Sequence, residues 1–131
     1  MLILPTTLSL AAAAAVINVW LISRVIRLRL SGKVTHGDGG QPLLLQRMRA
    51  HANFAENAPL TLLLIAGIEV TGKGGTWLAI TGAVFMLARI LHAFGMDNAG
   101  PNRVRATGMV TTLAIQLGLA AMAVLIALGR F

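Results

Sequence analysis

The sequence contains no cysteine and no tyrosine, and only four of its 131 residues are acidic. Without cysteine the chain has no disulfide framework, no thiolate metal site and no thiol nucleophile of its own. Any sulfur chemistry must therefore use a thiol that a substrate brings. Charged residues make up only 11% of the chain, against about 25% in an ordinary soluble domain, so that class is excluded.

The abundant residues are hydrophobic or positively charged. Hydrophobic residues account for 56% of the chain, the mean hydropathy is +0.79 and the formal net charge is +7. In a soluble protein this charge would suggest nucleic-acid binding, but here the basic residues flank apolar runs and aromatic residues make up only 5%. The pattern is typical of a membrane protein, so we expect the lipid bilayer and not a nucleic acid as partner.

Four apolar segments are each long enough to cross about 30 Å of hydrocarbon as a helix. They cover residues 2–23, 41–70, 77–96 and 107–129. The first lacks the basic start and the short core of a cleaved signal peptide, so we expect a retained transmembrane helix. The short, glycine-containing connections make neighbouring helices antiparallel. The sequence predicts one all-α domain, residues 1–131, that forms an integral membrane bundle of four transmembrane helices.

The basic residues are distributed unevenly between the two ends of this bundle. The first and third connections, with their flanks, carry Arg24, Arg27, Arg29, Lys33, Arg47, Arg49, Arg103 and Arg105. The opposite end carries only Lys73 and Arg130. Because positive loops stay in the cytoplasm, we expect connections one and three there and both termini outside.

A polar stripe follows the first half of the second segment, in the stretch RMRAHANFAENAP. At helical spacing, Arg49, Asn53 and Glu56 fall within one arc of roughly 100°. Facing lipid, each charged group would cost several kcal/mol, so the stripe must face protein or a cavity. Gln116 and Asn18, in otherwise apolar spans, are expected to form interhelical hydrogen bonds.

The third segment carries a second buried cation. Arg89 follows Trp77 by about 18 Å of helix, which places it at the depth of Glu56 and predicts a Glu56–Arg89 ion pair. His92 shares the face of Arg89. The arginines on this side outnumber the acid: Arg27, Arg49, Arg89 and Arg103. Either these charges only fix the register of the bundle, or the surplus guanidinium groups bind an external anion.

The stretch RAHANFAENAP resembles the second-helix signature of the MAPEG superfamily, the membrane-associated proteins in eicosanoid and glutathione metabolism. Arg49, Ala50, His51, Asn53 and Glu56 occupy that signature. VIRLR, ARILH and PNR are similar to the family patterns at the end of helix one, in helix three and before helix four. The chain looks most like the small bacterial branch, since it lacks the tyrosines of the eicosanoid enzymes and has Met96 where one of them stands.

This resemblance implies a homotrimer in the bacterial inner membrane, with glutathione bound between subunits and open to the cytoplasm. The implied activity is a glutathione transferase that conjugates the thiolate to hydrophobic electrophiles, or a glutathione peroxidase, with a hydrophobic second substrate from the bilayer. Arg103 corresponds to the arginine that activates the thiol; Arg105 is the alternative, because the loop length leaves the register open. The implied binding residues are Arg27, Arg49, Asn53, Glu56 and His92. We add Arg89 to this set because it shares a helical face with His92.

Other classes stay open beside this interpretation. The missing tyrosines leave room for a catalytically silent binding or scaffold protein of the same fold. A small multidrug transporter has a similar length, but it would need an acid midway along the first span to couple protons, and none is present. No metal site is expected, because His36 near one aspartate supplies too few ligands.

Overall fold

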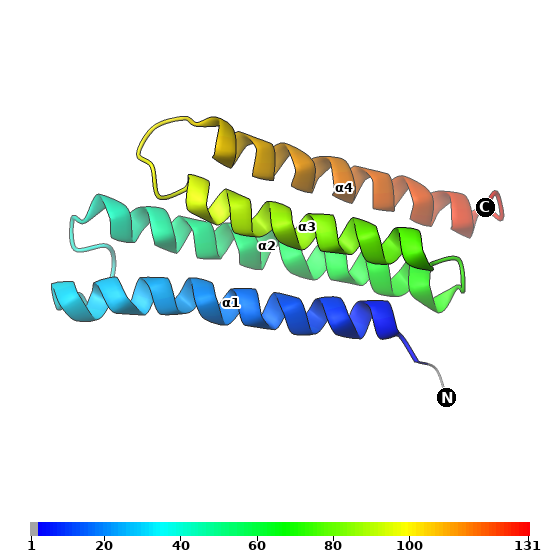
Figure 1. Cartoon of the computed structure of the whole chain (residues 1–131), viewed down its shortest axis with the longest axis horizontal. Helices are drawn as coiled ribbons and strands as arrows, with labels where there is room; N and C mark the ends of the chain where they lie inside the picture. The colour runs from blue at the N-terminus through cyan, green and yellow to red at the C-terminus, as the bar shows by residue number, and fades with distance from the viewer. Residues whose placement is uncertain (1–2) are drawn as a thin grey trace.

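The computed structural model describes residues 3–131 and folds them into an antiparallel bundle of helices (Figure 1). No strand occurs within these residues. The all-α, four-helix architecture predicted from the sequence is confirmed. The helices are α1 (Pro5–Gly32), α2 (Pro42–Val70), α3 (Thr76–Gly95) and α4 (Arg103–Ala127).

Helix α1 is longer than the apolar segment that predicted it. The helix does not end at the arginines after residue 23 but continues to Gly32, where Lys33 adopts a left-handed conformation with φ 53°. Arginine is a good helix former, so a run of arginines marks the end of the hydrocarbon layer and not the end of the helix. The charged last turns of α1 therefore extend the bundle beyond its apolar part.

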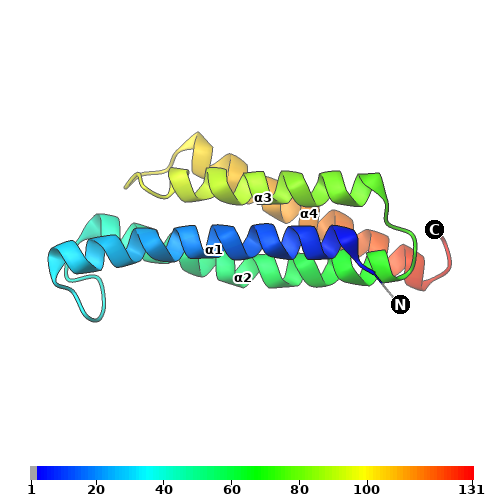
Figure 2. The same cartoon turned by 60° about the horizontal axis from the view of Figure 1, so that its bottom comes forward.

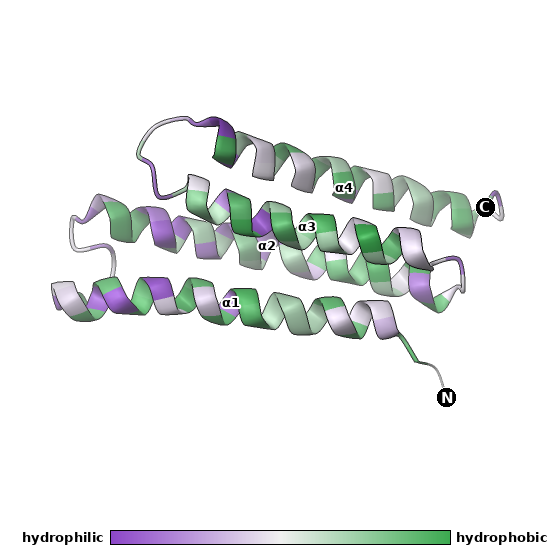
Figure 3. Cartoon of the chain, in the orientation of Figure 1, coloured by the Kyte–Doolittle hydropathy of each residue, from purple (hydrophilic) through white to green (hydrophobic). Residues whose placement is uncertain are grey.

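Three of the described helices, α1, α3 and α4, are long and apolar enough to cross a membrane. Helix α2 has 29 residues, but polar residues crowd its first half. Figure 3 shows that hydrophilic residues gather at one end of the bundle, where the α1–α2 and α3–α4 connections both lie. This end holds the cationic surface that the sequence predicts.

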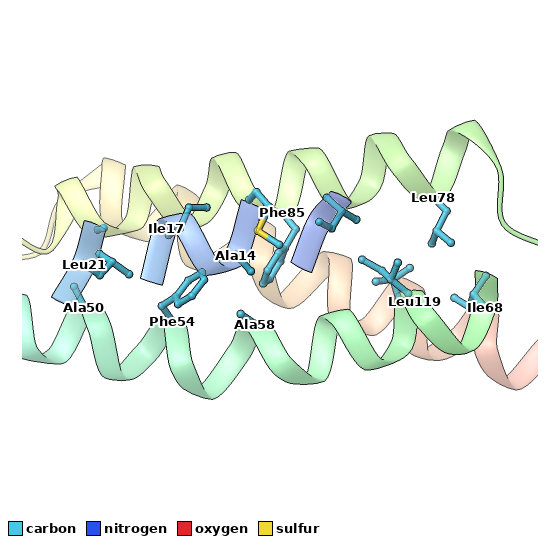
Figure 4. Packing of buried hydrophobic residues seen from close by; sticks show 14 residues of the cluster. Ala14, Ile17, Leu21, Ala50, Phe54, Ala58, Ile68, Leu78, Phe85 and Leu119 are labelled. Atoms are coloured by element: carbon cyan, nitrogen blue, oxygen red, sulfur yellow. The ribbon is translucent and has the colours of Figure 1, made fainter. Parts of the chain in front are cut away.

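The helices pack in sequence-neighbouring pairs. Helix α1 lies along α2 and α3 lies along α4, while α1 and α4 make no contact with each other within the described residues (Figures 1 and 2). Apolar side chains from all four helices fill the interior. Figure 4 shows Phe54 of α2 and Phe85 of α3 in this space, beside Ala14 of α1. Close packing of this kind holds helices together where lipid removes the hydrophobic driving force between them.

Polar contacts fix the helices at three depths. Near one end, Glu69 accepts hydrogen bonds from the backbone N–H groups of Thr6 and Thr7. Farther along, the Gln116 amide donates to Thr61 Oγ1 over 3.1 Å, and His51 Nε2 lies 2.9 Å from the Asn18 side-chain oxygen. The interhelical hydrogen bonds predicted for Gln116 and Asn18 are therefore confirmed.

Candidate functional site

A cleft with a volume of about 600 Å³ opens between α2, α3 and α4 at the charged end of the bundle. This volume falls in the range of small-molecule binding sites. One part of its lining is apolar: Ala52, Met96, Pro101, Ala106, Met109 and Val110. The polar part comprises Arg49, Asn53, Glu56, His92, Asn102 and Arg105. Such a cleft suits a charged ligand that also carries or meets an apolar group.

The structure brings together five of the residues predicted for the site: four on α2 and α3, and the alternative Arg105 on α4. Arg49, Asn53 and Glu56 line the cleft from α2, and His92 lines it from α3. The α2 residues share a wall because positions i, i+4 and i+7 lie on one helical face. The polar stripe thus faces a cavity, as the cost of burying charge in lipid requires.

Two exposed arginines that were predicted for the site lie outside this cleft. Arg27 is exposed on α1, which contributes no residue to the lining of the cleft. Arg103, the first residue of α4, is also exposed and does not line the cleft, whereas Arg105 does. Two residues of helix turn a side chain by about 200°, which explains why these neighbours face different surroundings.

The connection between α3 and α4 holds Arg105 in place. Asn102 caps α4 by accepting a hydrogen bond from the Arg105 backbone N–H, 2.8 Å away, and its side-chain amide donates to the Gly95 carbonyl over 2.8 Å. At Gly95 a Cβ atom would lie 2.4 Å from the backbone nitrogen of Arg105, so only glycine permits this close approach of the two helices. The first turn of α4 is thereby fixed against the end of α3.

Arg89 lies behind the cleft and is only 1% exposed. Its guanidinium donates to Thr112 Oγ1 over 3.1 Å and to the side-chain oxygen of Asn53, and it lies 3.4 Å from His92 Nδ1. The predicted Glu56–Arg89 ion pair is therefore wrong. Asn53, one turn earlier on α2, occupies the position opposite the guanidinium.

The charged groups of the cleft have no ionic partners within residues 3–131. Glu56 is exposed and forms no ion pair, and neither do Arg49 and Arg105. The cleft thus offers two guanidinium groups and one carboxylate to a ligand. Guanidinium groups bind carboxylates through two parallel hydrogen bonds, and a carboxylate binds an ammonium group.

A second charged cluster was missed by the sequence analysis. Arg24 of α1, only 6% exposed, forms an ion pair with Asp97, and Arg47 Nε lies 3.5 Å from the other oxygen of that carboxylate. The Arg24 guanidinium also lies 4.9 Å from the ring centre of Trp20 and 5.7 Å from that of Phe94. The sequence feature that could have predicted this cluster is Asp97, the single acid that follows the third apolar segment, on the side where arginines are in excess.

Comparison with known proteins gives consistent matches. A model of the MAPEG family matches residues 7–125. The chain is 35% identical over 89 residues to the inner membrane protein YecN of Escherichia coli K12, and the protein of the same name from Escherichia coli O6:H1 matches equally well. Each match covers 67% of this chain and 66% of the relative, so it spans just under two thirds of the length of these proteins.

Proposed function

Because the chain belongs to the MAPEG family and is an integral membrane protein, we propose that its cleft binds glutathione as a thiol cosubstrate. The observation that carries the proposal is a set of charges in the cleft that form no ion pair within residues 3–131: two guanidinium groups and one carboxylate. In a membrane-embedded site such groups are costly unless a ligand of opposite charge binds them.

The charges of glutathione are complementary to those of the cleft. The tripeptide carries two carboxylates, one ammonium group and one thiol. Arg49 binds a carboxylate, Glu56 binds the ammonium group and the Asn53 amide binds the peptide backbone. Arg27 of a second copy supplies the contact for the other carboxylate. Arg105 is left to stabilise the sulfur.

The reaction that follows is transfer of the thiolate to a hydrophobic electrophile. A free thiol has a pKa of about 8.5, and a neighbouring guanidinium favours its charged form. The thiolate attacks the electrophilic carbon, a C–S bond forms, the leaving group departs with its electron pair, and the thiol proton passes to water. With a hydroperoxide as acceptor, two glutathione molecules are oxidised to the disulfide, and the peroxide is reduced to an alcohol and water.

The proposed assembly is a homotrimer in the bacterial inner membrane, with the α1–α2 and α3–α4 connections in the cytoplasm. Two features support it. Glu56 is exposed on a single chain at membrane depth, where a second subunit would shield it from lipid. The apolar wall of the cleft, which includes Met109 and Val110, would face the bilayer and receive a hydrophobic second substrate from it.

A catalytically silent binding protein of the same fold is the second candidate. Met96 lines the cleft, and the chain has no tyrosine that could donate a hydroxyl proton there. Such a protein would bind glutathione through the same charges without turning it over.

Ligand-dependent thermal unfolding of the detergent-purified chain tests the proposal. Glutathione should raise the unfolding temperature, and so should its analogue in which a methyl group replaces the thiol, because the carboxylates and the ammonium group are unchanged. Turnover with 1-chloro-2,4-dinitrobenzene separates the two candidates: binding with turnover supports the transferase, and binding without it, also with cumene hydroperoxide, supports the silent protein.

Two variants make this test specific to the cleft. Glu56→Gln should weaken glutathione binding by about tenfold or more, because the ammonium group loses its counter-charge. Arg130→Gln, an exposed charge change near the C-terminus, is the matched control and should bind as the unmodified chain does. Absence of any shift at saturating glutathione would refute the proposal.

A further inference from the structure

Arg89 is a buried cation that neutral groups alone hold in place. Its acceptors on the neighbouring helices are the Thr112 hydroxyl on α4 and the Asn53 amide on α2, and no carboxylate of the described chain reaches it. Its Nε has no partner within residues 3–131. A guanidinium that only fixed the register of the bundle would be expected to face an acid. The contacts of Arg89 lead instead to two residues that line the cleft.

The contact with His92 determines where the histidine carries its proton. A guanidinium group can only donate hydrogen bonds, and it lies 3.4 Å from His92 Nδ1. Nδ1 must therefore accept, so it carries no proton, and the proton of the neutral ring is on Nε2. His92 is 4% exposed and lines the cleft, so the ring nitrogen that remains for a ligand is a hydrogen-bond donor.

The contact with Asn53 fixes the orientation of its side-chain amide. Arg89 donates to the side-chain oxygen of Asn53, which fixes the oxygen end of this amide toward α3. The Asn53 NH₂ group forms no hydrogen bond within residues 3–131, and the residue lines the cleft. The end of the amide that remains for a ligand is therefore also a donor.

We propose that Arg89 is a positioning residue that makes this wall of the cleft donate hydrogen bonds. It holds His92 as the Nε2–H tautomer and orients Asn53 with its NH₂ group free. Together with Arg49 and Arg105 these groups give a cleft of donors in which Glu56 is the one carboxylate among the lining residues.

The consequence for catalysis rests on the proposed function. If glutathione is the ligand, His92 donates a hydrogen bond to it and does not remove the thiol proton, since Nδ1 is engaged by Arg89 and Nε2 already carries a proton. The proton then leaves to water, and the Nε2–H group of His92, together with Arg105, stabilises the thiolate. The tautomer itself follows from the contacts and does not depend on which ligand binds.

Nitrogen-15 NMR of the full chain in lipid nanodiscs, labelled at histidine and without ligand, tests the tautomer. The chain has three histidines, and His36→Gln and His51→Gln variants identify the signals of His92. We expect an unprotonated Nδ1 and a protonated Nε2 in the unmodified protein. A protonated Nδ1, alone or in a doubly protonated ring, would overturn the proposal without any variant having to fold.

Two substitutions test whether Arg89 is the cause. Arg89→Lys keeps the positive charge but loses the planar fork that reaches Asn53, Thr112 and His92 together, so His92 should become a mixture of tautomers. Thr112→Val removes a neighbouring acceptor and leaves the His92 contact, so the signals of His92 should keep their type. An unchanged tautomer in a folded Arg89→Lys protein would show that Arg89 is not responsible.

Two substitutions of His92 test the catalytic consequence. Asparagine retains a hydrogen-bond donor but cannot act as a base, whereas phenylalanine has neither a donor nor a base. His92→Asn should keep about tenfold more turnover than His92→Phe, the value of one hydrogen bond to a charged group. Equal loss in both variants, with glutathione still bound, would identify His92 as the base and overturn this part. If the tautomer is found as expected but the unmodified chain binds no glutathione, the proposed function fails and the positioning role of Arg89 stands.

Discussion

The guanidinium of Arg24 on α1 binds the carboxylate of Asp97, at the end of α3, across 73 residues of sequence. Arg47 of α2 lies 3.5 Å from the second oxygen of the same carboxylate. One acid therefore joins three helices at the charged end of the bundle. Asp97 thereby anchors the α3–α4 connection to α1 and α2 near the end of α3.

Substitution of Asp97 by alanine should destabilise the fold. It would leave two guanidinium groups without a counter-charge, and the side chain of Arg24 is only 8% exposed. Breaking a buried pair costs about 3–5 kcal/mol, and we expect about 3 kcal/mol because 27% of the Asp97 side chain is exposed. Chemical unfolding in detergent measures the change. Asp38→Asn, in the α1–α2 connection, is the control, and an equally small effect of both substitutions would contradict the prediction.

Substitution of Glu69 should loosen the start of α1. The N-cap residue of this helix, Leu4, offers no side-chain acceptor, and Glu69 of α2 fulfils that role from a distance. Its oxygens lie 2.8 Å from the Thr6 and Thr7 nitrogens and 2.7 Å from the Thr7 hydroxyl oxygen. Glu69→Ala should cost about 1–2 kcal/mol, the value of a lost helix cap.

Amide hydrogen exchange locates this effect. Exchange at Thr6 and Thr7 should accelerate in Glu69→Ala, while the amides of α4 keep their rates. In Glu69→Gln, which retains one acceptor oxygen, the exchange rates of Thr6 and Thr7 should fall between those of the unmodified chain and those of Glu69→Ala. Uniformly faster exchange along all helices would mean that Glu69 supports the whole bundle and not the end of α1.

Alanine substitution of the two arginines at the start of α4 should have unequal effects on thiol chemistry. Arg105 lines the cleft and Arg103 does not. Arg105→Ala should lower glutathione-dependent turnover by on the order of 10², the usual loss when one donor to a developing anion is removed. Arg103→Ala is the matched control, and the ratio of the two rates, with the pH profile of turnover, is the measurement. A larger loss in Arg103→Ala would mean that this residue reaches the cleft of another copy.

The fold could be predicted from the sequence because each signal is local. Apolar run length gives the depth of a span, and the spacing of Arg49, Asn53 and Glu56 gives one face of one helix. Their common wall in the cleft follows from that spacing alone. The polar contacts of Gln116 and Asn18 were also predictable, because an amide in an apolar span needs a partner.

The contacts that the sequence did not predict depend on rotation and on helix ends. Depth matching placed Arg89 and Glu56 at the same height, but it does not fix how two helices are turned toward each other. The choice between Arg103 and Arg105 depends on the residue at which α4 begins. The Arg24–Asp97 pair depends on the continuation of α1 beyond its apolar segment and on the path of the α3–α4 connection.

Two glycines of α4 offer a matched test of how closely α3 and α4 must pack beside the cleft. At Gly108 a Cβ atom would lie 2.7 Å from the Ala88 carbonyl oxygen and 2.8 Å from the His92 backbone nitrogen. These are backbone atoms of α3, which cannot rotate away as the end of a flexible side chain can. At Gly118, farther along the same helix, no atom of residues 3–131 lies within 4 Å of the corresponding position, apart from its chain neighbours and the nearby α4 backbone.

Gly108→Ala should therefore force α4 away from α3, whereas Gly118→Ala should not. Overpacking costs about 1–3 kcal/mol, and we expect Gly108→Ala to lower both the unfolding free energy and the affinity for glutathione, because His92 and Arg105 then no longer face the same ligand. Gly118→Ala should be neutral or slightly stabilising, since alanine favours a helix by about 1 kcal/mol over glycine. Unfolding and glutathione titration of both variants provide the comparison. If Gly118→Ala is the more harmful of the two, the open side of Gly118 must pack against another copy of the chain, and close contact there must matter more than contact beside the cleft.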